Sequence, residues 1–101
     1  MATWIYFIHP PRDDFAETMT EAEQVVWDDH FLRLKRLLDD GVLLLAGPTL
    51  GRLNTGIAIF EAPDEAAART IMADDPIAKG GWARVELRPF VVSLLRGTPA
   101  G

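Results

Sequence analysis

The chain has no cysteine among its 101 residues. This absence excludes disulfide bonds, thiolate nucleophiles and cysteine-ligated zinc or iron–sulfur sites. A cysteine-free chain suits a reducing compartment, and we expect a cytoplasmic protein. A metal site built on histidine is not predicted either, because the chain has only His9 and His30 and neither belongs to a tight His-x-x-His or Glu-x-x-His pair.

Basic charge is also scarce. Ten Lys and Arg residues stand against fifteen Asp and Glu residues, which gives a formal net charge of -5. Binding to nucleic acid depends on clustered cations that neutralise phosphates, so we do not expect a nucleic-acid partner. The densest basic group (Arg33, Lys35, Arg36) alternates with leucines and is interpreted as a solvated helix flank.

Long apolar runs are missing as well. No stretch approaches membrane-spanning length, and the start of the chain lacks the basic and apolar regions of a signal peptide, so we expect no membrane association. The length and the ordinary globular composition predict one domain over residues 1–101, with a tail over about 93–101.

Hydrophobic periodicity and turn residues divide the chain into six elements. They are, in order, a strand at Thr3–Ile8, a helix at Glu21–Asp40, strands at Val42–Ala46 and Gly56–Phe60, a helix at Glu65–Ala73 and a strand at Trp82–Phe90. Thr20 and Glu23 have the spacing of a capping box, and Asp64 is placed to cap the second helix. We expect residues 12–19 to form an irregular loop and residues 77–81 a short turn. Pro89 indicates that the last strand lies at a sheet edge or is bent.

This order of elements predicts an α+β, ferredoxin-like βαββαβ fold, with a four-stranded antiparallel sheet and both helices on one face. The second face of the sheet is also apolar. In the first strand Trp4, Tyr6 and Ile8 point opposite to Ile5 and Phe7, and alternation places Leu43 and Leu45 on a common side of the second strand. A sheet that is apolar on both faces needs another layer, so we expect a homodimer whose sheets pack together.

His30 is the unusual residue of the first helix. At about 100° per residue it lies inside the apolar arc formed by Trp27, Phe31, Leu34 and Leu38. Such a ring is either a core-edge residue bonded to a backbone carbonyl or the working group of a pocket.

Several motifs occur in a characteristic order, namely His30-Phe31-Leu32-Arg33-Leu34, then Ala46-Gly47-Pro48, then Asp75-Pro76 with Gly81, then Arg88-Pro89-Phe90. In this order they resemble the YCII-related (YciI-like) family of small bacterial proteins, over roughly Trp4 to Val92. The resemblance implies a dimeric α+β barrel and an active site formed by His30 and Asp75. It also implies a link, through a few relatives, to chemistry on hydroxylated or chlorinated aromatic rings. The loop from His9 to Asp14 is longer and more acidic than the family pattern, which indicates a different pocket mouth.

The chemistry of the candidate residues is simple. An imidazole accepts and returns protons near neutral pH, and the carboxylate of Asp75 would hold the tautomer of His30, with Asp74 as the competing carboxylate. His9 and Arg12 follow the first strand, in a position from which they could approach Asp75 and Arg12 could bind an anionic substrate group. The alternative is that both are surface charges on a flexible loop.

Four aromatic residues are candidates for lining an apolar substrate cavity, although such residues are also ordinary core. They are Trp4, Tyr6, Trp27 and Trp82, of which we select Tyr6 and Trp82 for the substrate site.

Two functions remain open on these grounds. The first is a small cofactor-independent enzyme of isomerase, lyase or hydrolase type, in which His30 and Asp75 transfer a proton on a small cyclic or aromatic substrate. The alternative is a non-catalytic dimeric module that binds a small molecule and in which His30 is structural.

Overall fold

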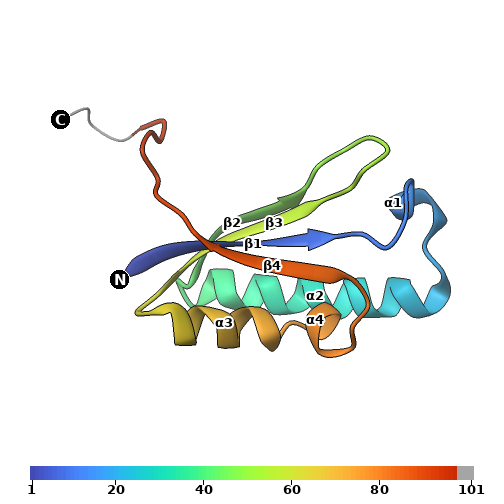
Figure 1. The fold of residues 1–101 in the computed structure, drawn as a ribbon, viewed down its shortest axis with the longest axis horizontal. Helices are drawn as coiled ribbons and strands as arrows, with labels where there is room; N and C mark the ends of the chain where they lie inside the picture. Colours follow the sequence, from blue (N-terminus) through green and yellow to red (C-terminus); the bar gives the residue numbers. More distant parts are fainter. Residues whose placement is uncertain (98–101) are drawn as a thin grey trace.

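A computed structural model describes residues 1–97 and shows the ferredoxin-like α+β fold that the order of elements predicts (Figure 1). The strands are β1 (Ala2–His9), β2 (Leu43–Pro48), β3 (Gly56–Ala62) and β4 (Arg84–Pro89), and the helices are α1 (Phe15–Thr18), α2 (Glu21–Asp39), α3 (Glu65–Ala73) and α4 (Pro76–Lys79). The predicted tail contains no helix or strand in residues 93–97, and its remaining part, 98–101, lies outside the described residues.

The four strands form one antiparallel sheet in the order β2-β3-β1-β4, and helices α2, α3 and α4 cover one face of it (Figure 1). Strand β4 with Pro89 is an edge strand, which is one of the two alternatives that the proline indicated, because proline lacks a donor for a further neighbour. Within the described residues no helix is long and apolar enough to cross a membrane.

The core lies between the sheet and the helices. Trp4, Tyr6 and Ile8 of β1 point into it beside Phe60 of β3, and Leu34 of α2 closes it from the helix side. The opposite side of β1 carries Ile5 and Phe7, so the predicted apolar character of both sheet faces is confirmed for this strand.

Local signals place α2 and α3 where the sequence predicts them. The Thr20 hydroxyl accepts the backbone N–H of Glu23 while the Glu23 carboxylate accepts that of Thr20, which is the complete capping box. The Asp64 carboxylate accepts the N–H of Ala67 at the start of α3. Residue Gly41 follows α2 with a φ of 77°, a conformation that favours glycine.

Two segments predicted as irregular are short helices. Residues 12–19 contain α1, because Phe15 is buried against Trp27 with ring centroids 4.6 Å apart and so anchors a turn. The predicted turn at 77–81 is largely α4, because Asp75 caps it and Pro76 supplies the first helical residue.

The prediction that Leu43 and Leu45 share one side of β2 is wrong. A register irregularity lies between them, so Leu43 pairs with Phe60 on the helix side while Leu45 pairs with Ile59 on the other side. The extra residue, Leu44, is what breaks the alternation. Leu43 is therefore buried, whereas Leu45 is exposed.

Candidate functional site

His30 and Asp75 come together at the centre of the helix layer. The Nδ1 atom of His30 lies 2.6 Å from Oδ2 of Asp75, although 45 residues separate them in the chain. Helix α2 presents the ring toward α4, and the cap of α4 holds the carboxylate, since the N–H of Ile77 donates to Oδ1 of Asp75 at 2.9 Å. Asp75 is fully buried, whereas Asp74 is exposed, so Asp75 is the carboxylate that faces inward.

Three donors converge on the Asp75 carboxylate. Besides His30 and Ile77, the Tyr6 hydroxyl donates to Oδ2 at 2.8 Å. Burial acts to raise the pKa of Asp75, but the hydrogen bond and charge of His30, the Ile77 N–H and the Tyr6 hydroxyl outweigh it, so this pKa lies below its usual value. Burial, and next the adjacent Asp75 charge, raise the pKa of Tyr6, which therefore stays a protonated donor.

These contacts determine the tautomer of His30. Since Asp75 is ionised and accepts at both oxygens, Nδ1 of His30 must carry the proton of the shared hydrogen bond. In the neutral ring the lone pair is then on Nε2. This nitrogen has no protein hydrogen-bond partner in the described part of the chain, and it is not among the buried polar atoms that lack one, so solvent reaches it.

His30 also lines a large pocket between α2 and the hairpin of β2 and β3. The pocket has a volume of about 680 Å³, and most of its wall is apolar. From α2 the side chains of Phe31 and Leu38 line it, and these are 58% and 53% exposed. The apolar arc of α2 thus continues past the core into an open cavity, with His30 at the boundary between the two.

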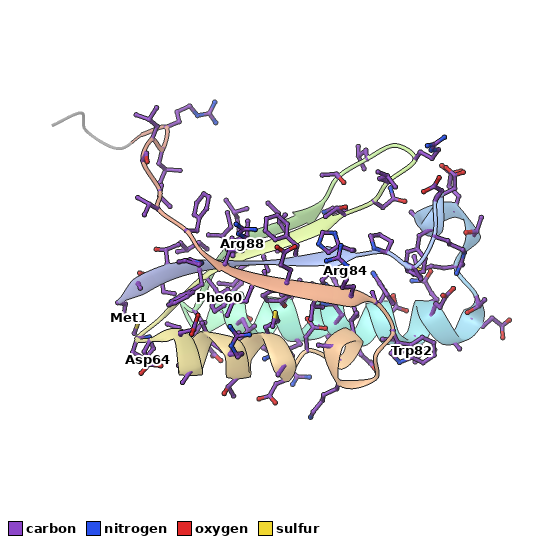
Figure 2. The ribbon with its side chains drawn as sticks, in the orientation of Figure 1. Met1, Phe60, Asp64, Trp82, Arg84 and Arg88 are labelled. Carbon is purple, nitrogen blue, oxygen red and sulfur yellow. The ribbon has the colours of Figure 1, made fainter. Side chains whose placement is uncertain are left out.

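The other predicted site residues lie elsewhere. Tyr6 reaches the site indirectly, through Asp75, and does not line the pocket. Trp82 lies in the turn between α4 and β4 with its indole against Gly80 and is also outside the pocket lining (Figure 2). Trp27, one of the alternatives, does line it.

His9 and Arg12 contact other partners than Asp75. The Nε2 atom of His9 lies 3.2 Å from Glu86 of β4. Arg12 binds both carboxylate oxygens of Glu23 at 2.8 and 2.9 Å and so ties the loop after β1 to the start of α2. The guanidinium of Arg12 is thus bound to the carboxylate of Glu23 at the cap of α2 and does not contact Asp75.

Arg33 is the residue that sequence reasoning missed. It was interpreted as part of a solvated flank, but its Nη2 donates to the carbonyl of Ile71 at 2.8 Å and its Nη1 is buried with no partner in residues 1–97. Its charge acts on Tyr6, where it lowers the pKa against the stronger effects of burial and Asp75. Its position three residues after His30, on the adjacent side of the same helix, was the available signal.

A family model described as the YCII-related domain matches residues 3–91. Among solved structures the chain is similar to a 5-chloro-2-hydroxyhydroquinone dehydrochlorinase from Burkholderia phenoliruptrix AC1100, in complex with 2,5-dihydroxybenzoquinone. The TM-score is 0.55 and the identity 20%, over 86% of this chain and 93% of that one, a likeness that supports the fold. No curated protein matches the chain.

Proposed function

The chain belongs to the YCII-related family, as its motifs predicted, and from this premise we propose that it is a small enzyme that transfers a proton on a cyclic or aromatic organic molecule. The observation that carries the proposal is the 2.6 Å contact between His30 Nδ1 and the buried Asp75, with the opposite side of the ring at a pocket. His30 is the proton-transferring group, and Asp75 is the residue that positions it.

The charge arrangement supports a general base. With Nδ1 protonated and bonded to Asp75, the basic lone pair of Nε2 is free to take a proton. The imidazolium that forms is stabilised by the ionised carboxylate, which itself remains unprotonated. The fully buried position of Asp75 keeps water from competing for these contacts.

The reaction step follows from this geometry. His30 Nε2 takes a proton from a carbon or oxygen of the bound ring, and the electron pair left behind is delocalised as an enolate or phenolate. The imidazolium, whose proton can exchange with solvent because solvent reaches Nε2, then gives a proton to another atom of the ring, which is an isomerisation, or to a leaving group, which is an elimination. Neither reaction requires a cofactor. We therefore propose an enzyme of isomerase or lyase type.

The similar dehydrochlorinase adds a suggestion about the substrate. Its name states an elimination from a hydroxylated, chlorinated ring, and its complex holds a dihydroxybenzoquinone. The pocket beside His30 has an apolar wall and a volume of about 680 Å³, which accommodates a ring of that size. We therefore propose hydroxylated six-membered rings as the first compounds to test.

Proton exchange tests the proposal without knowledge of the natural substrate. The wild-type protein is incubated in D₂O with hydroxyquinones, hydroquinones and cyclic diketones, and carbon-bound deuterium is followed by NMR. We expect catalysed exchange that falls by about 10²-fold to 10⁴-fold in His30→Asn, the range that one acid–base group contributes. Asp29→Asn, an exposed neighbour on α2, is the matched control and should keep the wild-type rate.

A different outcome would favour the alternative function. If the compounds bind to the wild-type protein but no exchange occurs, and His30→Asn binds them equally well, the protein is a small-molecule-binding module. The apolar pocket suits that role too, because burial of a ring needs no catalytic group.

We also propose that the protein works as a homodimer. The sheet face opposite the helices is apolar near its centre, where Ile5, Phe7, Ile57 and Ile59 lie on two adjacent strands. Val91 and Leu94, which follow β4, are 78% and 96% exposed. A second copy packed against this face would cover both groups, and the family resemblance supports that arrangement.

A further inference from the structure

The pocket beside His30 has an unusual charge for this chain. The whole sequence has fifteen acidic residues, yet no Asp or Glu of the described residues lines the pocket. Its only fully charged lining side chain within that part of the chain is Lys35, one helical turn beyond Phe31. The described lining of the pocket therefore contains one cation and no carboxylate, although the protein as a whole is acidic.

The Lys35 ammonium is available to a ligand. Within residues 1–97 no carboxylate lies at salt-bridge distance from it, and this includes Asp39, which follows one turn later on α2. Its Nζ atom lies 4.9 Å from the centre of the Phe31 ring, which lines the same pocket. A cation over an exposed aromatic ring is a combination that suits a flat molecule with a negative group.

Asn54 is the amide side chain among the described lining residues, and its polar atoms are already bonded to backbone groups of its own loop and of α1. Its side-chain nitrogen donates to the carbonyls of Thr49 and Gly51, and its oxygen accepts the N–H of Ala16. Trp27 also lines the pocket, and its indole N–H makes no hydrogen bond within residues 1–97. The polar side-chain groups left for a ligand, among the described lining residues, are therefore the Trp27 indole N–H, His30 Nε2 and Lys35 Nζ, and only the last of these carries a full charge. Lys35 follows His30 by five positions, about 7.5 Å along the helix axis at 1.5 Å per residue.

We propose that the pocket binds a planar organic anion, an apolar ring system with one ionised oxygen group, and that Lys35 is the residue that selects the charged form. The ring lies along Phe31 and Leu34, the anionic oxygen meets Lys35, and the far edge of the ring reaches His30. This inference rests on the proposed function, because it names the substrate class of the same site. Lys35 binds and discriminates; it takes no part in the proton transfer.

Two molecules of the same shape test it. 1-Naphthoate carries a carboxylate and 1-naphthamide does not, and both are titrated into the protein by calorimetry. We expect the wild-type protein to bind the anion about fivefold more tightly than the amide, the size of one exposed ion pair, and less so at high salt. Lys35→Met should remove the preference and leave amide affinity unchanged, while Lys35→Arg should restore it.

Arg36→Met is the matched control, since Arg36 is the adjacent exposed cation on α2 and does not line the pocket. It should keep the preference. Equal binding of the two compounds by the wild-type protein, binding of neither, or a preference that survives in Lys35→Met would each overturn the inference.

The experiments distinguish a failure of the proposed anionic substrate class from a failure of the proposed catalytic role of His30. His30→Asn should retain the preference for 1-naphthoate, because Lys35 and Phe31 are intact in it. If the wild-type protein exchanges protons on ring compounds without preferring anions, the proposed function stands and the substrate class is wrong. If the preference depends on Lys35 and no compound undergoes exchange, the substrate class stands and the catalytic role of His30 is wrong.

Discussion

At the scale of single residues, Asp75 is the point on which the buried polar contacts converge. It accepts from His30, Tyr6 and Ile77, and each donor comes from a different element. One carboxylate thus caps α4, joins that helix to α2 and β1, and determines the tautomer of the histidine. A carboxylate suits this position because it accepts at both oxygens and donates at neither.

Asp75→Asn should therefore lower both the free energy of unfolding and the rate of proton exchange. The amide turns one acceptor into a donor that faces other donors, and we expect a loss of about 2–4 kcal/mol in the free energy of unfolding. Where the amide nitrogen takes the place of Oδ2, the proton of His30 moves to Nε2 and the free base is lost, so proton exchange should fall. Urea unfolding and the exchange assay measure the two effects.

Asp74→Asn is the control for that experiment, since Asp74 is the exposed neighbour in the same turn. It should change the free energy of unfolding by less than about 0.5 kcal/mol. Equal losses in the two variants would mean that the turn, and not the buried contacts, is the sensitive feature.

At the scale of elements, the beginning of α2 is held by a small charged network. Arg12 donates twice to Glu23, and Glu23 closes the capping box with Thr20. The hydrogen bonds from Arg12, then the backbone N–H of Thr20, lower the pKa of Glu23 to about 2 from its ordinary 4.5. This network joins the loop after β1, the short α1 region and α2.

The free energy of unfolding at acid pH should depend on this network. The folded state binds a proton at Glu23 more weakly than the unfolded state, so this contribution is fully present above about pH 4.5 and is lost as the pH falls toward about 2. We expect Glu23→Gln to flatten the fall in unfolding free energy over that window. Circular dichroism of urea unfolding at a series of pH values measures the slope.

Glu21→Gln is the matched variant on the same helical turn. Glu21 is exposed, and the Arg12 guanidinium binds Glu23 instead of it, so the slope should remain that of the wild type. A wild-type slope in Glu23→Gln would show that other carboxyl groups govern the acid transition.

At the scale of the whole molecule, the sheet has one covered and one open face. Helices α2, α3 and α4 cover the first, while the second carries apolar side chains on β1 and β3 and charged ones on β4 (Figures 1 and 2). Glu86 of β4 forms ion pairs there with Arg84 and with Arg88. An apolar centre with a charged edge is a common form of interface between copies.

The dimer proposal predicts a mass of twice 11.2 kDa in solution. Phe7 lies on the open face opposite Glu86, so Phe7→Lys keeps a favourable pair within the sheet but buries two charges in a dimer. We expect the variant to sediment as a folded monomer. Leu32→Glu, on an exposed position of α2, should stay dimeric, and a monomeric wild type at micromolar concentration would contradict the proposal.

The sequence by itself determined the local structure and the fold. The capping box at Thr20, the Asp64 cap and the alternation in β1 each depend on residues close in the sequence, and the structure contains all three. The motifs also identified the family and named His30 and Asp75. The caps and the alternation follow from short-range chemistry, which a single chain displays directly, whereas the pairing of His30 with Asp75 was implied by the resemblance to the family.

Only the tertiary structure decided which groups meet. Asp75, and not Asp74, contacts His30, and the guanidinium of Arg33 is buried. Arg12 binds Glu23. The irregularity in β2 places Leu45 on the sheet face opposite the helices. Each of these outcomes depends on the packing of segments that are distant in the chain, or on one inserted residue that reverses the alternation of a strand. Spacing in the sequence carries no such information, because it does not say which way a side chain points once elements pack together.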